Sequence, residues 1–161
     1  MGGTLPPGAA PTIYKDLIEI GKKRDTYVIL DASGQALREG IAACPHVIKP
    51  NKSEAEEFLG REIKTIADAA KGAEEMLSVG SETVLLSLGG DGAICADKNG
   101  VFYAKPLCVP VKSTTGAGDT FLAGFVYGKN KNLGNAAAFK YAVSFSAAKI
   151  QTEGVDLPSF K

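Results

Sequence analysis

The chain has 161 residues, of which 45% are hydrophobic and 22% are charged. This length suits one ordinary domain, and the composition excludes an intrinsically disordered chain. The 18 basic and 18 acidic residues cancel, so the charge balance gives no sign of a nucleic-acid partner. No apolar run approaches the roughly 20 residues of a membrane-spanning helix, and the start lacks the features of a signal peptide. We therefore expect neither a nucleic-acid nor a membrane partner.

The cysteines and the single histidine do not predict a metal site. Cys44, Cys95 and Cys108 are widely spaced and include no Cys-x-x-Cys pair. We expect them to be buried free thiols of a reduced, cytoplasmic protein. His46 has only Cys44 as a nearby metal-binding residue, which argues against zinc. We expect His46 to lie in a strand or at its edge.

The first half of the chain alternates helical and strand patterns. Apolar periodicity and end signals predict helices over 11–24, 35–43, 53–59 and from 65 to just before Gly80. Short apolar runs predict buried strands over 27–30, 46–49 and 84–88. Ser53 and Glu56 form a capping-box pattern for the third helix, which should end at Gly60. This alternation predicts a parallel sheet with right-handed crossovers.

The second half begins with turn sequences. Those at residues 89–92 and Asn99-Gly100 bracket short strands over 93–96 and 101–104, and Asn99-Gly100 suits a type I′ hairpin. A further strand is expected over 107–111. Two helices should follow, one opening at Gly118-Asp119 and one over about 133–150. The predicted class is α/β, with a mostly parallel sheet and one antiparallel hairpin.

The most informative stretch is the glycine-rich turn from Ser113 to Phe121. It places Gly116, Ala117 and Gly118 in the first turn of a helix, where free N–H groups and the helix dipole bind a phosphate oxyanion. Asp119 in the same turn has two interpretations: a helix-capping acid, or a carboxylate that orients an attacking hydroxyl and accepts its proton. The pairing of an anion hole with a carboxylate favours kinase chemistry.

Two further turns follow predicted strands, where α/β proteins bind ligands. Asn51 and Glu54 can face a phosphate–magnesium group, with Glu54 reaching Mg²⁺ through water. The alternative is that Asn51 begins a turn and Glu54 favours the helix N-terminus. The turn over 87–92 can present backbone amides to a nucleotide, or it can be a plain hairpin turn.

Two common nucleotide-binding motifs are absent from the sequence. The sequence has no Gly-x-x-x-x-Gly-Lys-Ser/Thr phosphate loop. In the dinucleotide fingerprint Gly-x-Gly-x-x-Gly, Phe121 stands where the third glycine is needed, and no acidic residue ends a following strand. A Rossmann oxidoreductase is therefore disfavoured.

In their order along the chain, these motifs resemble those of the ribokinase-like (PfkB) carbohydrate kinases. The matching stretches are Asn51-x-x-Glu54, Ser87-Leu88-Gly89-x-x-Gly92 and Gly116-Ala117-Gly118-Asp119. Gly3-Thr4-Leu5-Pro6-Pro7-Gly8 and Ile48-Lys49-Pro50-Asn51 resemble the branch that phosphorylates sugar phosphates, namely fructose-1-phosphate kinase and tagatose-6-phosphate kinase. The resemblance runs from about Gly3 to the last helix. It implies a ribokinase-like three-layer α/β/α fold.

The resemblance also implies a role for each matched residue. Asp119 would be the catalytic base on the sugar hydroxyl, and Gly116, Ala117 and Gly118 would form the anion hole for the transferring phosphoryl group. Glu54 and Asn51 would arrange Mg²⁺ and the phosphates of ATP. The residues expected along ATP are Lys49, Ser87, Gly89, Gly92, Ser113 and Ser146. Ser113 departs from the acid that many relatives carry, although the fructose-1-phosphate branch often has Ser there.

Family members carry an additional N-terminal half with most of the sugar contacts, so residues 1–161 resemble the nucleotide-binding, catalytic half. We expect such a half to be a poor kinase alone, because positioning of the acceptor supplies much of the rate. A truncated sheet exposes an apolar edge, so we expect homo-association through that edge unless the chain is a fragment. The alternative function is a non-catalytic nucleotide-binding or assembly fragment.

Overall fold

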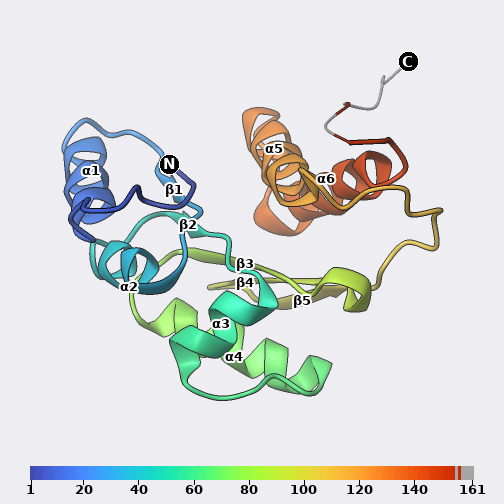
Figure 1. The fold of residues 1–161 in the computed structure, drawn as a ribbon, viewed down its shortest axis with the longest axis horizontal. Coiled ribbons are helices and arrows are strands. Elements are labelled where there is room, and N and C mark those ends of the chain that lie inside the picture. The colour runs from blue at the N-terminus through green and yellow to red at the C-terminus, as the bar shows by residue number, and fades with distance from the viewer. Residues whose placement is uncertain (155, 157–161) are drawn as a thin grey trace. The chain divides into compact units, whose positions relative to one another are not determined.

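The computed structural model describes residues 1–154 and 156. These residues form two compact units (Figure 1). The first unit comprises 1–89 and 94–103, and the second comprises 90–93 and the chain from 104 onward.

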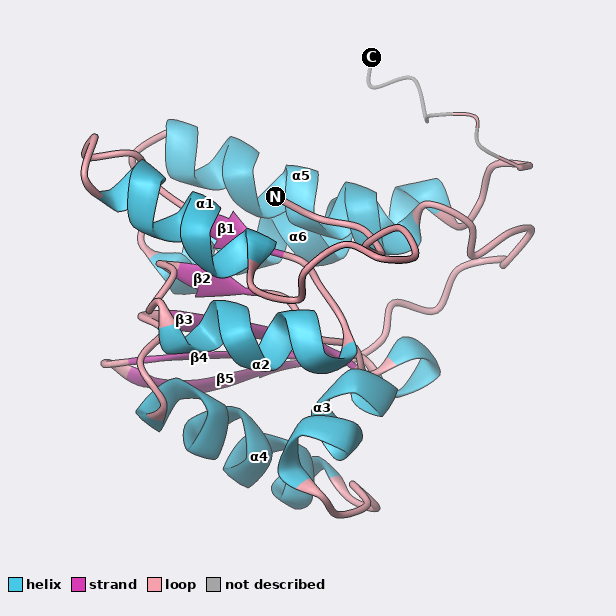
Figure 2. Ribbon diagram, turned by 60° about the vertical axis from the view of Figure 1, so that its left-hand side comes forward, coloured by secondary structure: helices cyan, strands magenta, loops and turns pink. Residues whose placement is uncertain are grey.

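The first unit holds a sheet and four helices. The helices are α1 (Ile13–Lys22), α2 (Gly34–Ala42), α3 (Lys52–Leu59) and α4 (Ile66–Ser78). The strands are β1 (Ile29–Leu30), β2 (Val47–Ile48), β3 (Thr83–Ser87), β4 (Ala93–Asp97) and β5 (Gly100–Ala104). Their order in the sheet is β1-β2-β3-β4-β5 (Figure 2). The pairs β1–β2 and β2–β3 are parallel.

The predicted hairpin is present, but its turn type differs from the prediction. Neighbouring strands β4 and β5 are joined by two residues, a link that only an antiparallel pair can make. A type I′ turn needs positive φ at two successive central residues, and Asn99 does not have one. Instead, the N–H of Asn99 donates to Asp97 Oδ1 at 2.7 Å. A local side-chain hydrogen bond therefore shapes the turn.

The core of the first unit is built from continuous apolar strands and one stripe of each helix. Val84, Leu85 and Leu86 of β3 are fully buried, as expected for a strand covered on both faces. The fully buried apolar residues of its helices are Ile18, Leu37, Ile41, Ala55, Ala69, Ala73 and Met76. Helix α1 packs beside α2, and α4 packs against β3. This packing fixes the strand ends from which the candidate site residues project.

The start of α3 corrects a prediction. Its N-cap is Asn51, whose Oδ1 accepts the Glu54 N–H at 2.9 Å, while Glu54 Oε2 accepts the Asn51 N–H at 2.8 Å. The capping box predicted for Ser53 and Glu56 is therefore wrong. Asparagine caps a helix as well as serine does, and the Asn51–Glu54 pair has the same spacing. The helix thus begins two residues earlier than that pattern implied.

Helix α4 begins at the predicted residue. Thr65 is its N-cap; Oγ1 of Thr65 accepts the Asp68 N–H at 3.1 Å, and Asp68 Oδ2 accepts the Thr65 N–H at 2.9 Å. The hydrogen bonds from the Thr65 side chain and backbone hold the pKa of Asp68 below its usual value. Gly60 ends α3 at φ 68° and Gly80 follows α4 at φ 138°, which confirms glycine at both helix ends.

The edge of the sheet beside β1 is lined by the first residues of the chain. The N–H of Asp31 donates to the Met1 carbonyl at 2.9 Å, and the N–H of Gly3 donates to the Asp31 carbonyl at 3.0 Å. Gly2 and Asp31 form a parallel bridge. Part of the edge predicted to be open is therefore paired within the chain.

The structure shows where the histidine and the three cysteines lie and whether they are buried. His46 lies directly before β2, and its Nδ1 accepts the Val28 N–H at 2.9 Å, so its predicted position is confirmed. No disulfide joins the cysteines; only Cys95 is buried, while Cys44 is half-buried and Cys108 is exposed. The prediction that the cysteines are buried is therefore wrong for Cys44 and Cys108. In the described part of the chain, no cluster of His, Cys, Asp and Glu can hold a metal ion and no helix can span a membrane.

The second unit contains the helix pair α5 (Ala117–Asn130) and α6 (Asn135–Lys149). The strand predicted over 107–111 is absent from this described segment, and its Leu107 and Val111 are exposed. Pro106 and Pro110 explain the difference, because a proline has no N–H to donate to a neighbouring strand. The segment is therefore an irregular connection that leads to the glycine-rich turn.

Two glycines allow α5 and α6 to pack closely. A Cβ on Gly124 would lie 2.5 Å from the Tyr141 carbonyl oxygen, and a Cβ on Gly128 would lie 2.5 Å from Ala138 Cα. Moving forward along α5 therefore means moving backward along α6, so the helices are antiparallel. This arrangement brings the start of α5 to the end of α6.

Candidate active site

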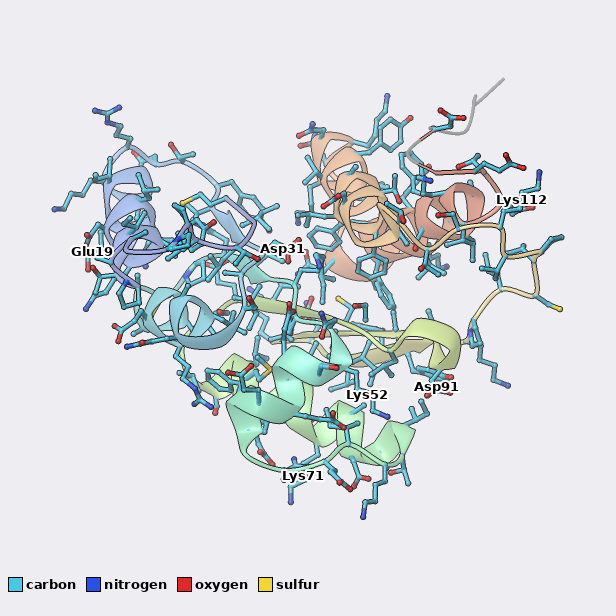
Figure 3. The ribbon with its side chains drawn as sticks, viewed as in Figure 1. Glu19, Asp31, Lys52, Lys71, Asp91 and Lys112 are labelled. Atoms are coloured by element: carbon cyan, nitrogen blue, oxygen red, sulfur yellow. The ribbon has the colours of Figure 1, made fainter. Side chains whose placement is uncertain are left out.

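In the first unit, polar residues lie at the carboxyl ends of three neighbouring parallel strands, β1, β2 and β3. Lys49 follows β2, and Asp31, which is labelled in Figure 3, follows β1. The Nζ of Lys49 forms a 3.1 Å ion pair with Oδ1 of Asp31. Lys49 is buried, with 6% of its surface exposed. Sequence reasoning predicted Lys49 along the nucleotide and gave Asp31 no role. The position of both residues directly after neighbouring strands is the signal that could have paired them.

Asn51 and Glu54 lie together, in the arrangement of the helix-start alternative. Their capping box uses Asn51 Oδ1 and Glu54 Oε2. Oε1 of Glu54 and the side-chain amide nitrogen of Asn51 have no partner among the described residues. One carboxylate with an open oxygen fits Mg²⁺ that is held mainly by nucleotide phosphates and water. The capping geometry thus leaves the metal role available.

Ser87 lies beside Asn51, and Gly89 follows at the end of the same strand. Asn51 and Ser87 form a parallel bridge, and the Ser87 N–H donates to the Pro50 carbonyl at 3.0 Å. Gly89 has φ 60° and opens a single 3₁₀ turn over Gly89–Asp91, where it is exposed. The structure therefore brings together Asn51, Glu54 and Ser87, with Gly89 two residues beyond.

In the second unit, Gly92 has a clear structural reason to be glycine. Its φ is 94°, and a Cβ on it would lie 2.2 Å from the Ala104 carbonyl oxygen. The fold alone accounts for this glycine. Its contact with a nucleotide stays a prediction.

The glycine-rich turn opens α5 without a side-chain cap. Gly116 is the N-cap residue at φ 76°, a left-handed conformation that favours glycine. The Ala117 N–H donates to the Thr114 carbonyl at 3.1 Å, so the prediction of an unpaired amide is wrong at Ala117. The backbone N–H groups of Gly116, Gly118 and Asp119 have no partner in the part of the chain that the structure describes. Three donors therefore remain for an anion.

Asp119 is exposed in the first turn of α5, and its carboxylate has no partner among the described residues. A capping acid at this position reaches back to the N-cap N–H, as Glu54 and Asp68 do. Asp119 does not. Its carboxylate is therefore available to a ligand in the same turn that leaves three amides open.

Hydrogen bonds within the second unit hold the residues that lead into this turn. The Lys112 and Ser113 N–H groups both donate to the Ile150 carbonyl, at 2.7 and 3.3 Å. Ser113 Oγ accepts the Thr115 N–H at 3.2 Å, so the hydroxyl of this predicted nucleotide contact helps to form the turn. Ser146 is half-buried on α6.

Sequence reasoning missed Lys149, the last residue of α6. Its side chain is 1% exposed, and its Cε lies 3.4 Å from the point where a Cβ on Gly116 would lie. The available signal was a lysine in the small and apolar run Ser146–Ile150, at the end of a helix.

The fold is that of the ribokinase-like carbohydrate kinases. It superposes on the crystal structure of phosphofructokinase-2 from Escherichia coli in complex with potassium with a TM-score of 0.91. The two chains are 29% identical, and the match covers 98% of this chain and 52% of the other.

Comparison with curated sequences defines the family. Residues 1–160 match the model of the pfkB family of carbohydrate kinases. The chain is 32% identical to 1-phosphofructokinase of Haemophilus influenzae over 95% of its own length and 49% of that relative. It is 35% identical to 1-phosphofructokinase of Haloferax volcanii over 100% of its own length and 52% of that relative. The chain belongs to the pfkB family, and it spans about half the length of these curated relatives.

Proposed function

We propose that the chain is the nucleotide-binding, catalytic half of an ATP-dependent kinase that phosphorylates a hydroxyl of a sugar phosphate. The observation that carries this proposal is the open start of α5. It combines unpartnered amides of Gly116, Gly118 and Asp119 with an unpartnered Asp119 carboxylate. The names of the relatives favour fructose 1-phosphate over tagatose 6-phosphate as the acceptor.

The open amides suit the charge that develops on a transferring phosphoryl group. Backbone N–H groups at a helix N-terminus point at an anion, and the helix dipole adds favourable potential. Their positions are fixed before the reaction, so no reorganisation is needed as charge develops. Gly116 and Gly118 carry no side chain that would keep a phosphate at a distance. Ala117 lies in the same turn but contributes no free amide.

The Asp119 carboxylate is proposed to act on the acceptor. It orients the sugar hydroxyl toward the γ-phosphorus and accepts its proton as the new O–P bond forms. The bond from phosphorus to the bridging oxygen breaks, and ADP leaves with that electron pair. Little proton transfer is needed early in such a loose transition state, so a weakly basic carboxylate suffices.

The first unit is proposed to contact the nucleotide and its metal ion. Asn51 and the open oxygen of Glu54 would hold Mg²⁺ through water. When bound, Mg²⁺ neutralises part of the phosphate charge. The remaining proposed contacts along ATP are Lys49, Ser87 and Gly89 in the first unit and Gly92, Ser113 and Ser146 in the second. For Lys49 we expect an indirect contribution, because its ammonium is paired with Asp31.

The substitution Asp119→Asn tests the catalytic role. The chain is mixed with Mg²⁺, ATP and either fructose 1-phosphate or tagatose 6-phosphate, and ADP release and ATP affinity are measured. We expect turnover to fall by about 10²- to 10⁴-fold, the usual contribution of a positioned acid or base. ATP affinity should stay within about twofold, because the anion-binding amides are unchanged.

Asp16→Asn is the matched control, since Asp16 is also an exposed acid in the first turn of a helix. It should leave turnover unchanged. Full turnover in Asp119→Asn would overturn the catalytic role.

A second candidate function is non-catalytic nucleotide binding or assembly. It is favoured by the half-length match to the relatives, because proximity to a well-held acceptor supplies much of the rate of such a reaction. ATP binding by the wild-type chain without transfer to either sugar phosphate would support it. Self-association through the sheet edge and a cytoplasmic location stay predictions. A clean monomer in size-exclusion chromatography at micromolar concentration would count against the association.

A further inference from the structure

The second unit contains a buried positive charge that the proposed reaction has not used. Lys149 is 1% exposed. Its Nζ donates to Thr152 Oγ1 at 3.0 Å and to the Gly154 carbonyl at 2.9 Å. Both acceptors are neutral, and among the described residues Nζ has no carboxylate partner. An ammonium has three N–H donors, so the third is unpartnered within the same part of the chain.

The packing of the two helices determines where this charge lies. Gly128 of α5 meets Ala138 of α6, and Gly124 meets Tyr141 and Ala142, with almost no space for a side chain between the backbones. Such close approach fixes the register of one helix against the other. Continued to the start of α5, the same antiparallel register places Lys149 at Gly116. The 3.4 Å approach of Lys149 Cε to a Cβ position on Gly116 confirms this.

The end of α6 therefore contacts the glycine-rich turn at two places. The Ile150 carbonyl holds the N–H groups of Lys112 and Ser113, which lead into the turn. The aliphatic part of the neighbouring Lys149 lies behind Gly116, the N-cap of α5. The ammonium of Lys149 in turn holds Thr152 and Gly154, which follow α6.

We infer that Lys149 is a positioning residue for phosphoryl transfer: its stem supports the Gly116 turn, and its buried ammonium raises the affinity of the nearby open amides for a phosphate. This inference rests on the proposed function of that turn. A buried cation without a carboxylate partner is costly, because it has lost its hydration. A phosphate bound at the turn supplies the missing negative charge. The ammonium is buried and its stem lies against Gly116, so its field reaches the turn through protein, where screening is weaker than in water.

The substitution Lys149→Met separates the two parts of this role, because it keeps a long apolar stem and removes the charge. ATP affinity is measured by isothermal titration calorimetry, and the melting temperature is measured in parallel. We expect Lys149→Met to bind ATP about tenfold more weakly, as for the loss of one charge interaction at a phosphate site. Its melting temperature should stay close to that of the wild type, because the removal of a buried charge offsets the lost hydrogen bonds to Thr152 and Gly154.

Lys140→Met is the matched control, since Lys140 is an exposed lysine of the same helix. It should leave ATP affinity unchanged. Lys149→Arg keeps the charge and should recover most of the affinity. Equal ATP affinity in folded Lys149→Met and Lys140→Met would overturn the inference while leaving the proposed function intact. Failure of the wild-type chain to bind ATP would remove both.

A measurement on the wild type does not depend on the folding of any variant. In a chain labelled with ¹⁵N at the lysine side chains, addition of Mg²⁺ and ATP should shift the Nζ resonance of Lys149 and leave that of Lys140 unchanged. A Lys149 resonance that does not move while ATP binds would contradict the inference, even if Lys149→Met does not fold.

Discussion

Two helix starts of the first unit, those of α3 and α4, place an acid at the same position as the start of α5 but use it differently. Glu54 in α3 and Asp68 in α4 are third helical residues, and each accepts a hydrogen bond from the N–H of its N-cap residue. Asp119 is the third residue of α5, but the Gly116 N-cap has no side chain and its N–H is unpartnered among the described residues. In a closed capping box, the N–H groups at the helix start are hydrogen-bonded to side chains of the same helix. At the open start of α5, these N–H groups are available to a ligand.

Among the tests of this contrast, the largest expected effect is on ATP affinity, when a negative charge is placed at the open start of α5. Gly118→Asp puts a second carboxylate beside the free amides, where it would repel a phosphate. We expect ATP affinity to fall at least about tenfold, since like charges at one site cost several kcal/mol. The substitution should not lower the melting temperature, because an acid in the first turn interacts favourably with the helix dipole. Calorimetric titration and thermal melting measure the two effects.

Ala136→Asp provides the control, because Ala136 is the second residue of α6 as Gly118 is of α5. It should leave ATP affinity unchanged. An unchanged affinity in Gly118→Asp would break the contrast between open and closed helix starts.

A smaller effect, on the free energy of unfolding, is expected at the closed capping box of α3. Asn51→Ala removes the N-cap of α3 and should lower the free energy of unfolding by about 1 kcal/mol. Ser53→Ala should change it by less than about 0.5 kcal/mol, because Ser53 is an exposed residue inside the helix and not its cap. Urea denaturation measures both variants. A larger loss for Ser53→Ala than for Asn51→Ala would contradict the observed box.

The smallest effect concerns the pH dependence of the second closed box. The hydrogen bonds from Thr65 hold the pKa of Asp68 below its usual value of 3.8. A carboxyl with a lowered folded-state pKa stabilises the fold above its unfolded pKa, and this stability is lost as the pH falls through the folded value. Melting temperatures of the wild type and Asp68→Asn should therefore differ near neutral pH and converge as the pH falls through the lowered pKa of Asp68. A constant difference over that range would contradict the assignment.

The sequence predicts much of the contrast between closed and open helix starts, but not all of it. The Asn51-x-x-Glu54 and Gly116-Ala117-Gly118-Asp119 spacings predicted both turns, because N-cap and phosphate-binding sequences are local. The choice between the Ser53 and Asn51 boxes was missed, since both satisfy the same spacing. The Ala117 amide was missed because its partner, the Thr114 carbonyl, depends on backbone geometry.

Contacts between distant segments were beyond the sequence. The Asp31–Lys49 ion pair depends on the neighbouring positions of β1 and β2. The burial of Lys149 depends on the register of α5 against α6, which glycines at 124 and 128 set through contacts with a helix that follows later. The strand expected over 107–111 does not form, because Pro106 precedes this apolar run and Pro110 interrupts it. Local patterns predicted the candidate site, whereas packing decides which of its groups are open.

The most direct test is an amide ¹H–¹⁵N spectrum of the wild-type chain titrated with Mg²⁺ and ATP. We predict large shifts for the N–H groups of Gly116, Gly118 and Asp119, and a smaller shift for Ala117, whose N–H is already bound. ATP binding that leaves the Gly116, Gly118 and Asp119 resonances in place would contradict the assignment of this turn as the phosphate site.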